Sequence, residues 1–298
     1  MSIVLPDVPE DFDDFWGEVR AEAEGVPLDF NRSLSNAFGL PGFKVETIAF
    51  RSVNGRTLHG WIAFPPEARR LPGFLWITPY GRESLLPNQY GTRPGMVSMS
   101  FNFFGHGPFD QEKYTPDRGY FAEGAGDPTT WVFRTMVQDC IVALRVIQAQ
   151  LEADEDGLAA MGMSQGGGLA IACGAHSPIV KAVCADMPFL GGIRSRLLAE
   201  TYRYPLKELS DYMENTPLGQ ERLFNTLGYF DSVNQATRCG VPTHVTLGLK
   251  DPASRPDAVR SIFEALPGPK ALTELDWGHD WHPDMVNVNR AWLARWLA

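Results

Sequence analysis

Apolar and polar residues follow two alternating periods along this chain, and the alternation predicts strands separated by helices. Short continuous apolar runs are typical of strands buried on both faces of a parallel sheet. Such runs occupy residues 73–78, 96–101, 158–161, 182–185, 243–248 and 271–275. Two β-rich runs, 44–51 and 57–64, are joined by Asn54-Gly55, a strong signal for an antiparallel hairpin. We therefore expect eight strands, the first pair antiparallel.

Helical periodicity fills the intervals between these runs. An acidic amphipathic helix is predicted over residues 9–24, and a second pattern extends from Phe133 to Leu151. The C-terminal segment also places Met285, Val288, Trp292 and Trp296 on one helix face. Strands that alternate with helices predict an α/β fold with a doubly wound, mostly parallel sheet. We expect a single domain over residues 1–298.

One segment, 188–239, contains more helix than a crossover between two strands requires. It carries three short helical patterns, over 193–200, 206–215 and 218–227, between two predicted strands. We interpret it as a small helical cap inserted over the carboxyl edge of the sheet.

Composition narrows the classes of partner and compartment. The 298 residues include 26 basic and 36 acidic side chains, a net charge of −10 that argues against a nucleic-acid partner. The four cysteines are scattered without metal-ligand spacing, as expected of free buried thiols in a reducing compartment. No leader pattern or long apolar stretch is found, so we expect a cytoplasmic protein without a membrane partner. No cofactor is expected.

The most informative motif is Gly162-Met163-Ser164-Gln165-Gly166, which follows the apolar run at 158–161. A G-x-S-x-G between a strand and a helix predicts a nucleophile elbow, a sharp turn that exposes a serine hydroxyl at the edge of the sheet. Glycine is needed on both sides because a Cβ there would collide with neighbouring backbone. The pentapeptide also recurs by chance, so its meaning depends on its partners.

An acid and a histidine follow this serine, each just after a later strand. Asp251 comes after the run 243–248 and before Pro252, and His279 comes after the last strand. A serine hydroxyl becomes a good nucleophile when a base removes its proton and a third group orients that base. The chain order Ser, Asp, His is the order found in α/β-hydrolases. The sequence therefore predicts a triad of Ser164, Asp251 and His279.

Other assignments remain open at this stage. Asp251 could serve only to cap its turn, and Asp257 is a competitor for the acid. His279 could be a surface residue, and His282 is the rival base. His279 and His282 together resemble an H-x-x-H ligand pair, but no third ligand is suggested nearby, so no metal is expected.

An acyl-transfer site also needs N–H donors for the oxyanion that forms during the reaction. One is expected from the backbone of Gln165, and the second from Tyr80, with Gly81 as the next choice. Position in the sequence suggests four residues for the substrate pocket, although each aromatic could equally belong to the core: Phe104, His106, Phe189 and Trp281. For His106 a structural role in its loop is the safer interpretation.

These motifs resemble the acetyl xylan esterase and cephalosporin C deacetylase family, carbohydrate esterase family seven. The similarity extends over nearly the whole chain, and its most specific part is the run Ser164-Gln165-Gly166-Gly167-Gly168. Its other parts are residues 9–16, 186–190, 210–212, 229–234, 248–252 and 277–280. The resemblance implies the same triad, Ser164, Asp251 and His279, with Tyr80 and Gln165 as oxyanion-hole residues. It also implies acetyl esters of short xylo-oligosaccharides and cephalosporins as substrates, and a ring-like hexamer.

The chain departs from the family pattern at several places. The family's Arg-Gly-Gln motif is Phe104-Gly105-His106 here, which removes an arginine and its donors. The His-Gly before the oxyanion tyrosine is Thr78-Pro79. No departure removes a triad residue.

The predicted function is therefore a serine carboxylesterase that removes short acyl groups, acetyl above all, from small esters such as acetylated sugars. The alternatives are a dienelactone-type, peptidase-like or carbon–carbon-bond hydrolase on the same fold, and a non-catalytic binding protein.

Overall fold

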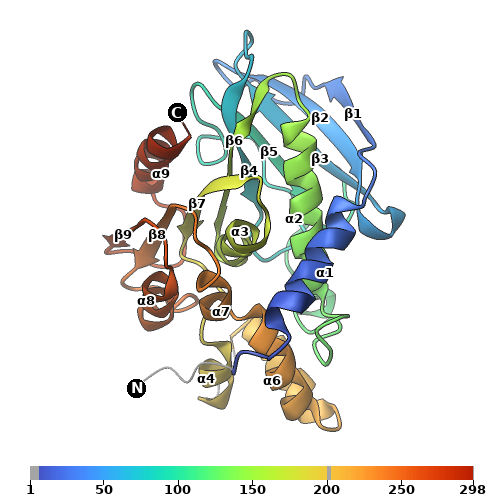
Figure 1. The fold of residues 1–298 in the computed structure, drawn as a ribbon, viewed down its shortest axis with the longest axis vertical. Helices are drawn as coiled ribbons and strands as arrows, with labels where there is room; N and C mark the ends of the chain where they lie inside the picture. The colour runs from blue at the N-terminus through green and yellow to red at the C-terminus, as the bar shows by residue number, and fades with distance from the viewer. Residues whose placement is uncertain (1–6, 200–202, 298) are drawn as a thin grey trace.

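The computed structural model describes residues 7–199 and 203–297, which fold around one nine-stranded sheet (Figure 1). The spatial order is β1-β2-β3-β5-β4-β6-β7-β8-β9. The strands are β1 Phe30–Leu34, β2 Lys44–Arg51, β3 Thr57–Phe64, β4 Leu71–Ile77, β5 Val97–Asn102, β6 Ala153–Met163, β7 Val180–Asp186, β8 Thr243–Gly248 and β9 Lys270–Leu275. Neighbours from β5 to β9 are parallel, whereas β1, β2, β3 and β5 pair antiparallel. The expected α/β class and the hairpin between β2 and β3 are confirmed.

The expected count of eight strands is wrong, because the described residues form a ninth strand, β1, that no apolar pattern predicts. This strand pairs antiparallel with β2 at the edge of the sheet, with Arg32 opposite Ile48. None of its five residues is buried, so it carries no apolar run and no hydrophobic alternation. It is stabilised by polar contacts instead, since Arg32 pairs with both Glu46 and Glu152.

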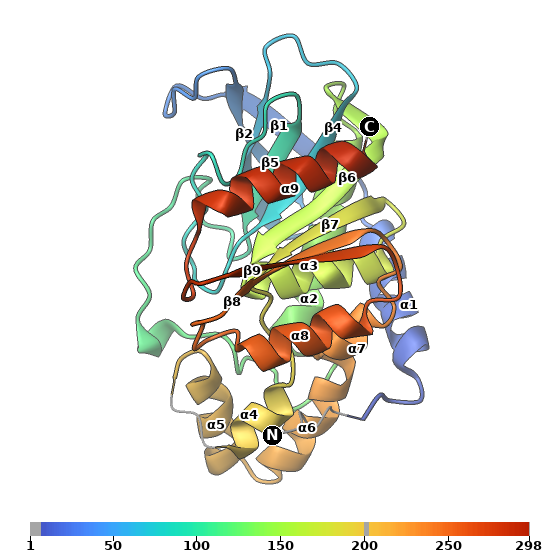
Figure 2. The same ribbon diagram turned by 90° about the vertical axis from the view of Figure 1, so that its left-hand side faces the viewer.

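The central strands β4, β6 and β7 are apolar on both faces because helices cover both. In β4, Phe74 and Trp76 belong to the core on one face, and Leu75 and Ile77 belong to the larger core on the other. Figure 2 shows α9 lying across one face of the sheet, opposite α2 and α3. The helices of these layers are α1 Phe12–Glu24, α2 Val132–Gln148, α3 Gln165–His176, α8 Pro256–Ala265 and α9 Pro283–Trp296. The helix expected over 9–24 begins at Phe12.

A group of short helices occupies the end of the molecule below the sheet in both ribbon views (Figures 1 and 2). They are α4 Ile193–Leu198, α5 Leu206–Asn215 and α6 Gly219–Phe230, and α7 Ser232–Ala236 then returns the chain to pack against α3 and α8. Two further 3-10 turns are η1 Val53–Gly55 and η2 Pro116–Arg118. These helices occupy the segment interpreted as a cap.

The parallel strands bring distant segments to one edge of the sheet. β4 leads to Tyr80, β6 to Ser164, β8 to Asp251 and β9 to His279. Because all four strands run in the same direction, their carboxyl ends meet at this edge, where α/β folds place their sites.

The cysteines can be compared with what the composition predicts. All four cysteines are buried and free of disulfides, as expected. Within residues 7–199 and 203–297, no helix is both long enough and apolar enough to cross a membrane.

Candidate active site

Ser164 occupies a sharp turn between β6 and α3. Its backbone adopts φ 59° and ψ −120°. For any residue with a Cβ, this strained conformation costs about 1–3 kcal/mol. The last residue of β7 and the loop that follows it hold this conformation through two backbone hydrogen bonds. The Ser164 N–H donates to the carbonyl of Asp186 at 2.9 Å, and the Ser164 carbonyl accepts from the N–H of Phe189 at 2.8 Å.

The glycines around Ser164 leave room for the close approach of β4, β6 and α3. A Cβ on Gly166 would lie 2.3 Å from the carbonyl oxygen of Ile77, and one on Gly162 would lie 2.5 Å from Gly166. Both contacts are with backbone, which cannot move aside as a flexible side chain can. Glycine is therefore required at both positions, for the reason anticipated from the sequence.

A continuous line of hydrogen bonds joins the serine to a histidine and an aspartate. The Oγ of Ser164 lies 2.9 Å from Nε2 of His279, and Nδ1 of His279 lies 2.7 Å from Oδ2 of Asp251. The Asp251 side chain is fully buried, while that of His279 is 23% exposed. Solvent and substrate can therefore reach the histidine but not the acid.

The loop around Asp251 fixes which oxygen of its carboxylate faces the histidine. Oδ1 accepts hydrogen bonds from the backbone N–H groups of Ala253 at 2.7 Å and Ser254 at 2.9 Å. Oδ2 is left for His279. Because a carboxylate only accepts, the proton of a neutral His279 lies on Nδ1, and the lone pair of Nε2 points toward the hydroxyl of Ser164.

Backbone hydrogen bonds join the loop of the acid to the loop of the histidine. The N–H of Lys250 donates to the carbonyl of Trp277 at 2.9 Å, and that of Leu249 donates to Leu275 at 2.8 Å. The Lys250 ammonium also pairs with Asp276 at 2.8 Å. Asp251 and His279 are thus held at a fixed separation.

The two rival residues lie elsewhere. Asp257 is in the first turn of α8, where its carboxylate accepts from the N–H of Ala258 at 3.1 Å and is about half exposed. His282 is the N-cap of α9, and its Nδ1 accepts from the N–H of Asp284 at 3.2 Å. The structure brings Ser164 together with Asp251 and His279, and with neither rival.

The expected oxyanion donors lie on the two segments next to the serine. Gln165 is the first residue of α3, where the helix offers its N–H no carbonyl partner and the helix dipole is positive. Tyr80 follows the end of β4. The N–H of Gly81, the second choice, already donates to the hydroxyl of Tyr120 at 3.0 Å. This contact favours Tyr80 as the source of the second donor.

A residue of the cap reaches the side chain of Tyr80. The Tyr80 hydroxyl donates to the carboxylate of Glu208 on α5, whose other oxygen accepts from the N–H of Phe121 at 2.6 Å. Burial raises the pKa of Glu208, and burial together with the Glu208 contact raises the pKa of Tyr80 well above its usual range. No local sequence pattern predicts a role for Glu208 or Tyr120, because both reach the site only through the packing of distant segments.

The three aromatic residues suggested for the pocket lie in different surroundings. Phe104 packs on Tyr120, with ring centres 4.7 Å apart. Phe189 is 4% exposed and belongs to the main core. Trp281 lies between Trp76 at 5.5 Å and Tyr90 at 5.2 Å. Contact of any of the three with substrate stays a prediction.

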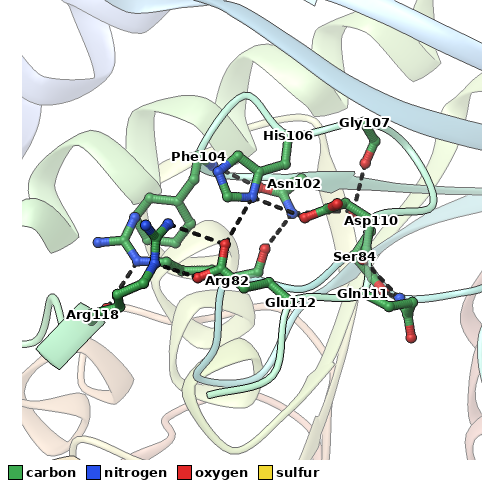
Figure 3. A network of polar contacts seen from close by, with 10 residues as sticks. All are labelled: Arg82, Ser84, Asn102, Phe104, His106, Gly107, Asp110, Gln111, Glu112 and Arg118. Carbon is green, nitrogen blue, oxygen red and sulfur yellow. Dashed lines mark hydrogen bonds and ion pairs between the residues drawn. The ribbon is translucent and has the colours of Figure 1, made fainter. Parts of the chain in front are cut away.

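His106 belongs to a polar network on the loop after β5 (Figure 3). Its Nδ1 lies 3.0 Å from a carboxylate oxygen of Asp110 and 3.6 Å from one of Glu112. Both oxygens of Glu112 in turn accept from Arg118, at 2.5 and 3.1 Å. His106, Asp110 and Glu112 are close enough together to hold a cation, but the guanidinium already neutralises Glu112. These contacts fit a role in holding the loop together.

A family profile and a relative of known description both match most of the chain. The profile of the acetyl xylan esterase (AXE1) family matches residues 5–298. The acetyl esterase Axe7A of Xylanibacter ruminicola is 22% identical over an alignment 300 residues long. The alignment covers 96% of this chain and 67% of that protein.

Two solved structures have the same fold over almost their whole length. The acetyl xylan esterase from Paenibacillus sp. R4 superposes with a TM-score of 0.87 at 24% identity, covering 99% of this chain and 97% of that one. Acetyl xylan esterase 1 from Thermoanaerobacterium sp. JW/SL YS485 also gives 0.87, at 23% identity, covering 99% and 96%. The expected α/β-hydrolase fold is confirmed.

Proposed function

Because the chain belongs to the acetyl xylan esterase family, we propose that it removes acetyl groups from small ester substrates through an acyl-enzyme on Ser164. Membership of that family makes the chain a carboxylic ester hydrolase. The observation that carries the proposal is the line of hydrogen bonds from Ser164 Oγ through His279 to Asp251, at 2.9 and 2.7 Å. The catalytic roles below follow from this geometry.

In the first half-reaction, Ser164 Oγ attacks the acetyl carbonyl while Nε2 of His279 takes the hydroxyl proton. Asp251 holds the ring and stabilises the imidazolium that forms. The negative charge on the former carbonyl oxygen is bound by the N–H groups of Tyr80 and Gln165. When the tetrahedral intermediate collapses, the carbon–oxygen bond to the alcohol breaks. His279 then gives its proton to the leaving alkoxide, which departs as the alcohol.

In the second half-reaction, water takes the place of the alcohol. Nε2 of His279 removes a proton from the water, whose oxygen attacks the acetyl group on Ser164. A second tetrahedral intermediate collapses, the bond to Oγ breaks, and His279 returns the proton to Ser164. Acetic acid leaves and loses its proton to solvent, and the site is restored.

The substrates we propose are small acetylated carbohydrates. Support comes from the family and from the relatives, which are described as acetyl esterase and acetyl xylan esterases. The same comparisons do not favour a dienelactone-type, peptidase-like or carbon–carbon-bond hydrolase. A non-catalytic binding role is disfavoured by three side chains already in hydrogen-bonding geometry.

The assembly implied by the family resemblance, a homo-oligomer and specifically a hexamer, stays a prediction. Light scattering on the purified protein would test it, because a monomer and a hexamer differ sixfold in mass.

Turnover on a matched set of substrates tests the proposed function. We expect p-nitrophenyl acetate and acetylated xylo-oligosaccharides to be hydrolysed, with turnover falling as the acyl chain lengthens and little activity on the corresponding amides. Ser164→Ala should abolish hydrolysis, since it removes the nucleophile. An active Ser164→Ala variant, or a wild-type protein that releases no acetate from any of these esters, would contradict the proposal.

A further inference from the structure

The hydroxyl of Tyr120 lies between the two segments that carry the proposed oxyanion donors. It accepts a hydrogen bond from the N–H of Gly81 at 3.0 Å and donates to Oε1 of Gln165 at 3.0 Å. Gly81 directly follows Tyr80, and Gln165 supplies the other donor. One hydroxyl therefore bridges the loop after β4 and the first turn of α3. We propose that Tyr120 is a positioning residue that sets the separation of the two oxyanion-hole N–H groups.

Burial keeps this bridge intact across the neutral pH range. Tyr120 is 1% exposed, and burial raises the pKa of its phenol above the usual value. The hydroxyl therefore keeps the proton that it donates to Gln165. Gln165 is fully buried, so water has little access to its Oε1, and a lost hydroxyl would leave that oxygen unpaired.

The ring of Tyr120 is held on several sides, which fixes the position of its hydroxyl. Its centre lies 4.7 Å from the ring of Tyr80 and 4.7 Å from that of Phe104. The guanidinium of Arg82 lies 4.2 Å from the Phe104 ring centre and 5.6 Å from that of Tyr120.

Arg82 is anchored in its turn by the network of Figure 3. Its Nε donates to the carbonyl of Arg118 at 2.9 Å, and its own carbonyl accepts from the side-chain amide of Asn102 at 2.7 Å. The bridge is therefore supported by the loop that follows β5 as well as by the ring contacts of Tyr120 with Tyr80 and Phe104.

The backbone after Tyr80 needs such a restraint. Gly81 has φ +150°, a value that L residues rarely adopt and that glycine adopts freely. A glycine hinge next to a catalytic donor allows the loop to shift unless something holds it. The bond from the Gly81 N–H to Tyr120 supplies that restraint.

The consequence for catalysis follows from geometry. An oxyanion hole works when its donors lie about 2.7–3.1 Å from the developing oxyanion before the reaction begins. The two donors here come from separate segments of the chain. Tyr120 couples them, so its loss should weaken binding of the tetrahedral state more than binding of the planar ester.

The test is Tyr120→Phe, which keeps the packed ring and removes only the hydroxyl. Tyr229→Phe is the matched control, because it also keeps a buried ring and removes one hydroxyl. Tyr229 lies on α6, and its hydroxyl donates a hydrogen bond to Asp11 at 2.6 Å. For Tyr120→Phe we expect kcat on p-nitrophenyl acetate to fall about 10- to 100-fold with KM within about threefold. Inhibition by phenylboronic acid, which forms a tetrahedral adduct with an active serine, should weaken by a similar factor. Tyr229→Phe should stay within about twofold of wild type in both measurements.

A second variant covers the case in which Tyr120→Phe does not fold. Gln165→Met removes the acceptor on the other side of the bridge and keeps the backbone N–H, so it should lower kcat by a similar factor. The effects of the two changes should be non-additive, because both break one bridge.

The inference rests on the proposed function, and the two can fail separately. An active wild-type enzyme whose Tyr120→Phe or Gln165→Met variant keeps kcat and phenylboronate inhibition within about twofold would overturn the bridge alone. A wild-type protein without ester turnover would overturn the proposed function and the bridge with it.

Discussion

Replacing Asp251 by asparagine tests how the acid controls the protonation of His279. The two oxygens of Asp251 have different partners: Oδ1 accepts from two backbone N–H groups, and Oδ2 faces Nδ1 of His279 at 2.7 Å. An asparagine at this position must keep its carbonyl oxygen on the two N–H groups. Its NH₂ group then points at His279.

That orientation of the amide changes which ring nitrogen of His279 carries the proton. An NH₂ donor facing Nδ1 requires Nδ1 to accept, which moves the ring proton to Nε2. Nε2 then has no lone pair with which to take the proton of Ser164. We expect kcat for p-nitrophenyl acetate to fall by about a thousand- to ten-thousand-fold, equivalent to about 4 to 5.5 kcal/mol of activation free energy.

The assay is steady-state hydrolysis with a folding check by thermal unfolding. Asp257→Asn is the matched control, because Asp257 is partly exposed on α8 and does not contact His279. It should keep turnover within about threefold of wild type. The reasoning would be refuted by an Asp251→Asn enzyme within tenfold of wild type, or by loss of turnover in Asp257→Asn.

Three further predictions follow from the strained serine, a buried histidine and the cap. Because Ser164 adopts φ 59° and ψ −120°, the Ser164→Gly protein should be more stable to urea than Ser164→Ala by about 1 kcal/mol. Both variants should be inactive. A more stable alanine variant, which is the usual order, would contradict the backbone strain. Burial lowers the pKa of His176 to about 4, below its ordinary 6.5, so the unfolded chain binds more protons between these values and the native state loses stability as the pH falls through them. The stability advantage of wild type over His176→Phe should therefore shrink by about 2 kcal/mol from pH 7 to pH 5, and an unchanged difference would show that His176 titrates normally. Glu208→Ala removes the hydrogen-bond acceptor of the Tyr80 hydroxyl and should lower the free energy of unfolding by about 1–3 kcal/mol. Its control is Glu214→Ala, on the exposed side of the same helix, which should change that free energy by less than about 0.5 kcal/mol. Equal effects of the two changes would argue against the contact between Tyr80 and Glu208.

The central sheet and the positions of Ser164, Asp251 and His279 at its edge could be predicted because their signals are local. Most strands after the hairpin contain a short apolar run bounded by turn residues, and Asp251 and His279 each come just after a strand. Parallel strands then bring their carboxyl ends to one edge by topology alone. The first strand, β1, could not be predicted, because an exposed edge strand needs no apolar face.

The supports of the oxyanion segments could not be predicted in the same way. Tyr120 bonds to Gln165 across 45 positions of the chain, and Glu208 bonds to Tyr80 across 128. Nothing in the local pattern of a loop tyrosine or a helix glutamate indicates such a partner. These contacts depend on how the cap and the loop after β5 pack over the sheet, which no periodicity encodes.

The most direct test of the acyl-enzyme proposed here is the site of covalent labelling by a serine-directed phosphonate. After incubation and proteolysis, mass spectrometry of the peptides should find the adduct on Ser164, at one label per chain, with turnover lost in proportion to labelling. The Ser164→Ala protein should take up no label. An adduct on any other residue, or full esterase activity in a protein labelled at Ser164, would contradict the account.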